Sequence, residues 1–360
     1  MSRAVAAALL ATLAWASSPA AQTPGNRPAN ASATGTATPQ GAHTVAGATA
    51  VLSNRCTWQW TNLNGAGGGA DGRPAVDAAG RVFFRTIFGG LGAIAWNGSS
   101  WQTLSLGVTP SNVAGNPVAV GSDMVVYRTS SGGLDGVKWT GSQWVQVSLG
   151  GSSLQVSGDP VVDVAGKIVY RRSGATPRLN ALYWSGSSWQ WTDLSGAGGN
   201  VALGGLATDA QDKIYYVRSN GDLNAIWWGG SQWQWTELSH AGSNATGNLT
   251  VDASGKVFYR RSNGNLNAIY WAGSGWQWTG LNDAGGNATD DILAGPNNHV
   301  FYRRSNGDLN AIWWDGSQWQ WTGLNGAGTH VSGGLALDGA GKVYYVNGST
   351  ASVNAIYWSC

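Results

Sequence analysis

From about residue 56 to the C-terminus, short apolar segments alternate with polar, glycine-rich turns. In one unit, segments 256–261 and 266–271 are rich in β-branched and aromatic residues, which favour strands. The Asn-Gly pair at 263–264 between them is a strong hairpin signal, because both residues tolerate positive φ. An apolar run such as 334–338 predicts a preceding strand, and 276–281 predicts a following one. Each unit is therefore expected to fold as four antiparallel strands.

Pairs of tryptophans, five residues apart around a glycine, mark each repeat of this unit. Successive pairs lie 43 to 45 residues apart, and no helical signal occurs between them. The pairs are Trp96/Trp101, Trp139/Trp144, Trp184/Trp189, Trp228/Trp233, Trp271/Trp276 and Trp314/Trp319. This period is typical of one four-stranded blade of a β-propeller. A stacked solenoid is the competing architecture, but its end repeats would need caps.

The two ends of the repeat region favour a closed ring. Segment 56–63 matches a fourth strand that has no preceding three, and segment 354–358 matches a third strand that has no fourth. Together they complete a seventh blade. We therefore predict an all-β, seven-bladed β-propeller over residues 54–360, closed by three strands from the C-terminus and one from the N-terminus.

The same alignment relates the only two cysteines. Trp358 corresponds to Trp271 and Trp58 to Trp276, so Cys360 and Cys56 fall at adjacent positions of the hairpin that the chain break removes. We predict a Cys56–Cys360 disulfide there; two unrelated free thiols are the alternative. Closing a loop of roughly 300 residues would stabilise the fold by about 4–5 kcal/mol in the chain-entropy description.

The N-terminal region has a different composition. Residues 1–20 combine Arg3, a short apolar stretch and small residues at a cleavage site, which is typical of a secretory signal peptide. Residues 21–53 are rich in Pro, Ala, Thr, Gly and Asn, as in a flexible leader. We therefore expect secretion, and no membrane insertion, because no later segment approaches twenty apolar residues. With 20 Lys and Arg against 18 Asp and Glu, no basic block favours nucleic acid as a partner.

The residues that carry chemistry give no catalytic or metal pattern. The four histidines are scattered without metal-ligand spacing, so no metal or cofactor is expected. One aspartate position recurs after the first strand, as in a turn-capping role, at Asp77, Asp163, Asp209, Asp252 and Asp338. Asp123, Asp290 and Asp291 break the repeat. No catalytic residue is assigned, yet a propeller glycosidase or polysaccharide lyase stays open as an alternative.

Tryptophan is the abundant functional residue, with 22 in the chain. Indole rings stack on the C–H face of sugars, whereas amide and guanidinium groups bind hydroxyls. A W-Q-W triplet and a third-strand Asn recur in the later repeats, but the first two repeats lack them, with Gly92 and Gly136 in place of Asn. A late second-strand Arg follows nearly the same split, and is replaced by Thr86 and Thr129 in the first two repeats and by Asn347 in the last. This split indicates either a repeated binding site or drift after duplication. The candidate sugar-binding residues are Trp184, Trp228, Trp271, Trp314, Trp358, Trp191, Trp235, Trp278, Trp321, Asn180, Asn224, Asn267, Asn310, Arg172, Arg218, Arg261 and Arg304.

The order of these motifs resembles the bacterial seven-bladed propeller lectins of the Photorhabdus lectin type, over essentially all of residues 56–360. The resemblance implies glycan binding between adjacent blades by tryptophan stacking, with fucose or O-methylated sugars as ligands. The matching positions are the third-strand tryptophans and the triplets that follow them. The chain departs from the family pattern in having Tyr or Phe where those second strands carry Glu, and in a shorter hairpin between the third and fourth strands.

These observations predict a secreted, multivalent carbohydrate-binding protein. Several weak sites on one rigid ring would give avidity on a surface that bears many glycans. Two alternatives remain: the propeller glycosidase or lyase, and a repeat scaffold that binds protein through a broad apolar patch.

Overall fold

The computed structural model describes residues 57–63, 68–194, 199–238, 244–281, 287–324 and 329–359, without the side chain of Asp290. The predicted signal peptide, the leader, Cys56 and Cys360 lie outside these residues. In the described ranges, no helix is long and apolar enough to cross a membrane.

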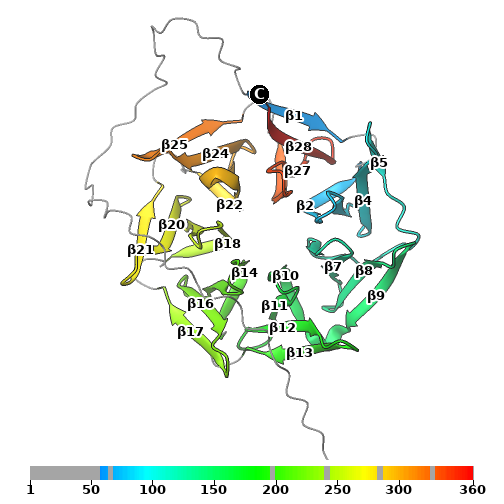
Figure 1. The fold of residues 1–360 in the computed structure, drawn as a ribbon, viewed down its shortest axis with the longest axis horizontal. Coiled ribbons are helices and arrows are strands. Elements are labelled where there is room, and N and C mark those ends of the chain that lie inside the picture. The colour runs from blue at the N-terminus through cyan, green and yellow to red at the C-terminus, as the bar shows by residue number, and fades with distance from the viewer. Residues whose placement is uncertain are drawn as a thin grey trace, which may run out of the picture. The chain divides into compact units, whose positions relative to one another are not determined.

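Seven four-stranded antiparallel sheets surround a common centre (Figure 1). Blade 1 comprises β2 (Ala70–Val76), β3 (Val82–Thr86), β4 (Leu91–Trp96) and β5 (Trp101–Thr103); blade 2, β6 (Val118–Val120), β7 (Met124–Arg128), β8 (Leu134–Trp139) and β9 (Trp144–Gly150); blade 3, β10 (Val156–Val162), β11 (Ile168–Arg172), β12 (Arg178–Trp184) and β13 (Trp189–Asp193). Blade 4 comprises β14 (Val201–Thr208), β15 (Ile214–Arg218), β16 (Leu223–Trp228) and β17 (Trp233–Glu237); blade 5, β18 (Ala245–Val251), β19 (Val257–Arg261), β20 (Leu266–Trp271) and β21 (Trp276–Gly280). Blade 6 comprises β22 (Ala288–Ala294), β23 (His299–Arg304), β24 (Leu309–Trp314) and β25 (Trp319–Gly323), and blade 7 comprises β26 (Val331–Leu337), β27 (Val343–Asn347), β28 (Ser352–Ser359) and β1 (Thr57–Asn62). Two short 3-10 turns, η1 (Ser152–Leu154) and η3 (Pro296–Asn298), interrupt the loops. The predicted seven-bladed, all-β fold is confirmed.

Blade 7 combines both ends of the described chain. Its sheet has the order β1-β28-β27-β26, and β1 pairs antiparallel with β28. In that register Trp58 lies opposite Trp358, and Thr57 opposite Ser359. The first and last strands therefore lie side by side at the rim (Figure 1).

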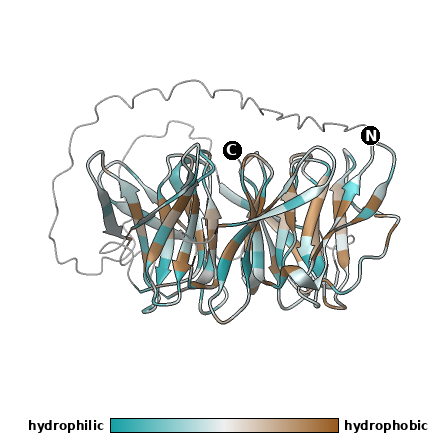
Figure 2. Ribbon diagram, turned by 90° about the horizontal axis from the view of Figure 1, so that it is seen from below, coloured by the Kyte–Doolittle hydropathy of each residue, from teal (hydrophilic) through white to brown (hydrophobic). Residues whose placement is uncertain are grey.

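The core lies between the blades. Seven clusters of buried side chains are described, and each one joins facing sides of two neighbouring blades. Val169 and Leu179 of blade 3, for example, pack with Ile214 and Ile226 of blade 4. Because each blade is covered by a neighbour on both sides, its strands carry apolar stretches, which are brown in Figure 2.

The recurring aspartate after the first strand caps a turn, as predicted. In blade 1, Asp77 Oδ1 accepts hydrogen bonds from the backbone N–H groups of Ala79 and Arg81, at 3.0 and 2.9 Å. In blade 7, Asp338 accepts the equivalent bonds from Ala340 and Lys342. This carboxylate therefore belongs to the blade scaffold.

A recurring lysine, which the sequence analysis missed, links neighbouring blades through cation–π contacts. The Lys213 ammonium lies 5.4 Å from the Trp227 ring of its own blade and 6.0 Å from the Trp276 ring of the next. Lys256 lies between Tyr270 and Trp319 in the same way. Such contacts stabilise by roughly 0.5–2 kcal/mol each. Their sequence signal was the basic residue that recurs at the start of the second strand.

Candidate functional site

The two tryptophans of each hairpin contact one another in every blade. They lie opposite each other on the third and fourth strands, as Trp184 and Trp189 do. Their ring centroids are 5.0 to 5.9 Å apart, mostly edge to face. Because all seven blades share this pair, it serves the blade itself.

Three indoles share one face of the blade where the W-Q-W triplet is present. Residues two apart on a strand point to the same side, and so do directly opposed residues on neighbouring strands. Trp184, Trp189 and Trp191 therefore lie on one face, which we call the aromatic strip of blade 3. Trp189 packs against the core between blades 2 and 3. Trp184 and Trp191, however, are 54% and 55% exposed.

The aromatic strip recurs in blades 3 to 7. The third-strand members are Trp184, Trp228, Trp271, Trp314 and Trp358, and the outer members of the triplets are Trp191, Trp235, Trp278, Trp321 and Trp60; all ten are exposed. In blades 1 and 2, Thr103 and Gln146 occupy the outer position, opposite Ile94 and Val137. A blade therefore packs without this second tryptophan.

The candidate asparagines are buried inside the blades. Asn180, Asn224, Asn267 and Asn310 are 1–3% exposed. Asn224, Asn267 and Asn310 each donate to the hydroxyl of a second-strand tyrosine, as Asn310 Nδ2 does to Tyr302 at 3.0 Å. Asn180 occupies the same position opposite Tyr170. We therefore assign these amides to the blade core, where a ligand does not reach them.

The sheet register corrects one alignment in the sequence analysis. Asp135, not Gly136, stands opposite Tyr127 and so takes the asparagine position in blade 2. In blade 1 the pair is Phe84 and Gly92, which lack both the hydroxyl and the amide. The tyrosine and the asparagine are thus lost together in blade 1, as expected of two groups that satisfy each other.

The candidate arginines lie far from the third-strand tryptophans. Arg172 is opposite Arg178 at the start of β12, whereas Trp184 is at the end of that strand. Six steps of about 3.3 Å separate the two positions by roughly 20 Å. Arg218, Arg261 and Arg304 end their second strands in the same way. The structure therefore does not bring the Trp, Asn and Arg candidates together at one site.

The carboxylates that break the repeat lie on different blades. Asp123 precedes β7 of blade 2. Asp291 is on β22 of blade 6, where its carboxylate forms an ion pair with Arg303 Nε at 2.7 Å. Among the described residues, no group of three or more His, Cys, Asp and Glu side chains could hold a metal ion.

Large apolar side chains exposed elsewhere are scattered. Outside the aromatic residues of the third and fourth strands, the described ones are Ile87, Phe88, Val164 and Leu203. Ile87 and Phe88 are adjacent in the turn after β3, whereas Val164 follows β10 and Leu203 lies on β14. These four side chains come from blades 1, 3 and 4.

No model of a known protein family matches this sequence, and no curated protein matches it. Solved structures share its fold. Those found include YCF48 bound to a D1 peptide (TM-score 0.59, 14% identity, 86% of this chain and 99% of that one) and the Cps50 (Swd1) propeller domain of Myceliophthora thermophila (0.58, 9%, 82% and 99%). A lectin of Aleuria aurantia in complex with Fucα1-6GlcNAc aligns with a TM-score of 0.48 at 18% identity, over 72% of this chain and 97% of that one. The likeness to YCF48 and Cps50 at these identities is one of fold: this chain is a β-propeller.

Proposed function

We propose that this protein is a secreted, multivalent carbohydrate-binding protein whose aromatic strips bind glycans at the outer part of the blades. The observation that carries the proposal is the pair of exposed indoles on each of five blades, for example Trp228 and Trp235, which are 48% and 50% exposed. Burying an indole in a core is favourable, whereas two half-exposed indoles leave apolar surface in contact with water. That unfavourable free energy is removed when a ligand covers them.

The chemistry of the strip suits a sugar. The C–H face of a pyranose stacks on an indole, and its hydroxyls need polar partners nearby. Gln234 alternates with Trp233 and Trp235 on the fourth strand and is exposed on the opposite face. Trp233 packs toward blade 3, so the glutamine between the two tryptophans lies on the side of the sheet that faces the next blade, a signal that the sequence analysis passed over. Fucose or O-methylated sugars, as implied by the resemblance to the Photorhabdus-type lectins, are the first ligands to test.

Five strips on one ring support multivalency. Individually weak contacts become strong on a glycan-coated surface when several strips bind at once. We include secretion in the proposal because residues 1–20 have the composition of a signal peptide. Fusing residues 1–20 to a reporter that is active only after export tests that part separately.

The test compares the full chain with two variants on an immobilised-glycan panel. The first variant replaces the five outer tryptophans with the residues that blades 1 and 2 already carry there: Trp60→Thr, Trp191→Gln, Trp235→Gln, Trp278→Gln and Trp321→Gln. The second replaces the same five with Phe. We expect glycan binding by the parent chain, retention of most of it by the Phe variant, and its loss in the Thr/Gln variant at an unchanged melting temperature. Absence of any sugar-competed binding by the parent chain, or undiminished binding by the Thr/Gln variant, would overturn the proposal.

A further inference from the structure

The first strand of most blades carries a bulge near the centre of the ring. The register between the first and second strands shifts in six blades, as between Ser157 and Val161 of blade 3. A bulge bends the strand and re-aims the side chains next to it. Where two bulges approach each other, only glycine fits: a Cβ on Gly333 would lie 2.5 Å from the Gly72 carbonyl carbon.

Polar groups at these bulges connect three blades. Asn116 Oδ1 accepts a hydrogen bond from the backbone N–H of Arg73, at 2.8 Å. On its other side, Asn116 donates to both carboxylate oxygens of Asp159, from its backbone N at 2.9 Å and from Nδ2 at 2.6 Å. Asp159 is thus held in a fixed orientation, and the side chain of Arg73 takes no part in the connection.

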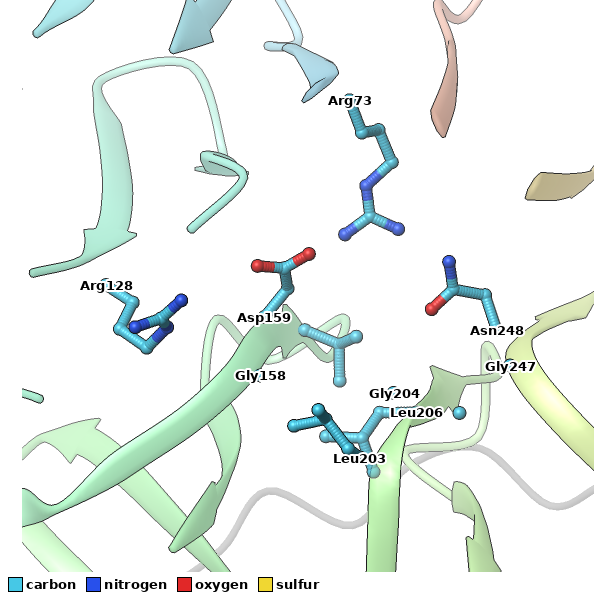
Figure 3. A pocket seen from close by; sticks show the side chains of 11 residues that line it. Arg73, Arg128, Gly158, Asp159, Leu203, Gly204, Leu206, Gly247 and Asn248 are labelled. Atoms are coloured by element: carbon cyan, nitrogen blue, oxygen red, sulfur yellow. The ribbon is translucent and has the colours of Figure 1, made fainter. Parts of the chain in front are cut away.

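A cavity of about 260 Å³ lies beside these residues. It is lined by Arg73, Arg128, Asp159, Asn248 and the backbone of several glycines, with Leu203 and Leu206 on one side (Figure 3). Figure 3 shows the Arg73 guanidinium directed toward the space between Asp159 and Asn248. Among the described residues, no hydrogen bond or ion pair involves that guanidinium, and Arg128 Nε is buried without a partner.

The charges around the centre favour an anion. The charged side chains that line the cavity are two arginines, Arg73 and Arg128, against one aspartate, Asp159. A carboxylate would pair with the free guanidinium of Arg73. Asp159 and the Asn248 carbonyl, in contrast, accept hydrogen bonds, so a ligand that satisfies them must also carry hydrogen-bond donors, such as hydroxyl groups.

We propose that this cavity binds a small hydroxycarboxylate of the uronic acid class. Its carboxylate pairs with Arg73, its hydroxyls donate to Asp159 and Asn248, and its C–H face contacts Leu203, which is 66% exposed. A zwitterionic amino acid also offers an anion and donors, but its zero net charge gains less from the excess of arginines. The pocket belongs to the inner strands, whereas the aromatic strips are on the third and fourth strands, so the two sites are independent.

Isothermal titration calorimetry with free glucuronate tests the pocket, with glucose and glycine as comparison ligands. Glucose lacks the carboxylate, and glycine replaces the hydroxyls with an ammonium group. Arg73→Gln removes the guanidinium but keeps the backbone bond to Asn116, so the fold should persist. Arg178→Gln is the matched control, because Arg178 is on β12 and does not line the cavity. Gly334→Ala is a second variant, since its Cβ would lie 2.7–2.8 Å from the Arg73 stem and displace it without changing charge.

We expect glucuronate to bind with a Kd at least about tenfold lower than that of glucose or glycine. Arg73→Gln should weaken glucuronate binding by about tenfold or more, Gly334→Ala should also weaken it, and Arg178→Gln should leave it unchanged. The proposal is overturned if glucuronate does not bind, if Arg73→Gln binds it as well as the parent chain, or if glycine binds more tightly. The Thr/Gln variant of the aromatic strips should bind glucuronate normally, so failure at one site is distinguishable from failure at the other.

Discussion

Trp58 of β1 packs edge-on against Trp358 of β28, with ring centroids 5.0 Å apart, and thereby joins the first described strand to the last. The same ring lies 5.6 Å from Phe301 of blade 6. β1 therefore contacts both its own sheet and the neighbouring blade, although its chain connection leads to blade 1.

Removing the Trp58 indole should weaken the propeller first at its seam, the β1–β28 pair where the two ends of the chain meet. We expect Trp58→Ala to lower the free energy of unfolding by about 2–4 kcal/mol, from lost burial and an incompletely refilled cavity. In the reduced protein, where no disulfide ties the start of β1 to β28, limited proteolysis should then cut next to β1 before it cuts elsewhere. Trp276→Ala, at the same position of blade 5, is the control: similar destabilisation is expected, but no early cleavage, because covalent connections hold β21 at both ends. Identical cleavage patterns in the two variants would contradict a special role for the seam.

A disulfide at the seam is the second prediction. Thr57 and Ser359, the described neighbours of the two cysteines, lie opposite each other in the strand register. Protein matured under oxidising conditions should be lighter than the reduced chain by two hydrogen atoms, and reduction should lower its stability by about 4–5 kcal/mol. The Cys56→Ser/Cys360→Ser variant should match the reduced protein and be insensitive to reductant. Two alkylatable thiols in oxidised material would refute the pairing.

Two buried tyrosines should respond in opposite ways to removal of the hydroxyl. Tyr302→Phe leaves the amide of Asn310 without its 3.0 Å partner, so we expect a loss of about 1–3 kcal/mol. Tyr127 has a buried hydroxyl without a hydrogen-bond partner among the described residues, so Tyr127→Phe should be neutral or stabilising. Urea unfolding of both variants measures the difference. Equal destabilisation would show that the amide–hydroxyl bond contributes nothing to the blade.

The Phe84/Gly92 pair of blade 1 offers a double-mutant cycle. A Cβ on Gly92 would lie 2.5–2.6 Å from the Phe84 ring, so Gly92→Asn alone should cost about 1–3 kcal/mol through overpacking. The double variant Phe84→Tyr/Gly92→Asn adds the amide–hydroxyl hydrogen bond of blades 4 to 6, which should recover part of that loss, about 0.5–1.5 kcal/mol. The coupling energy from the four unfolding curves is the measurement, and strict additivity would contradict the interpretation of the two positions as one unit.

Alkaline pH should unfold the blades through their tyrosines. Burial, followed by the nearby Asp135 carboxylate, raises the pKa of Tyr127 from 10.0 to about 12. Burial also raises the pKa of Tyr216, Tyr259, Tyr302 and Tyr345. Because the neutral form is favoured in the folded state, the stability is fully present below pH 10 and declines as the pH rises toward 12. The urea midpoint should therefore fall over this range, and less steeply in Tyr127→Phe. The difference in tyrosinate absorbance between the parent chain and Tyr127→Phe isolates the buried Tyr127, and ionisation of that group near pH 10 in a still-folded protein would contradict the prediction.

The sequence by itself determined the blade and the number of blades. Strand formation follows from local residue types and Asn-Gly turns, and the tryptophan period counts the repeats. The predicted second and third strands of blade 5 agree with β19 and β20 to within one residue. The first strand was predicted too short, because its bulge breaks the simple alternation that identifies a strand: β26 begins at Val331 rather than at residue 334.

Only the tertiary structure decided which repeated residues are available to a ligand. Trp191 and Asn180 recur with the same regularity, yet one is 55% exposed and the other 1%. Repetition alone does not separate a blade requirement from a binding surface. Arg73, Asn116 and Asp159 come together from three blades, each 43 residues from the next. No local pattern predicts such contacts, because they depend on how neighbouring blades approach each other around the centre of the ring.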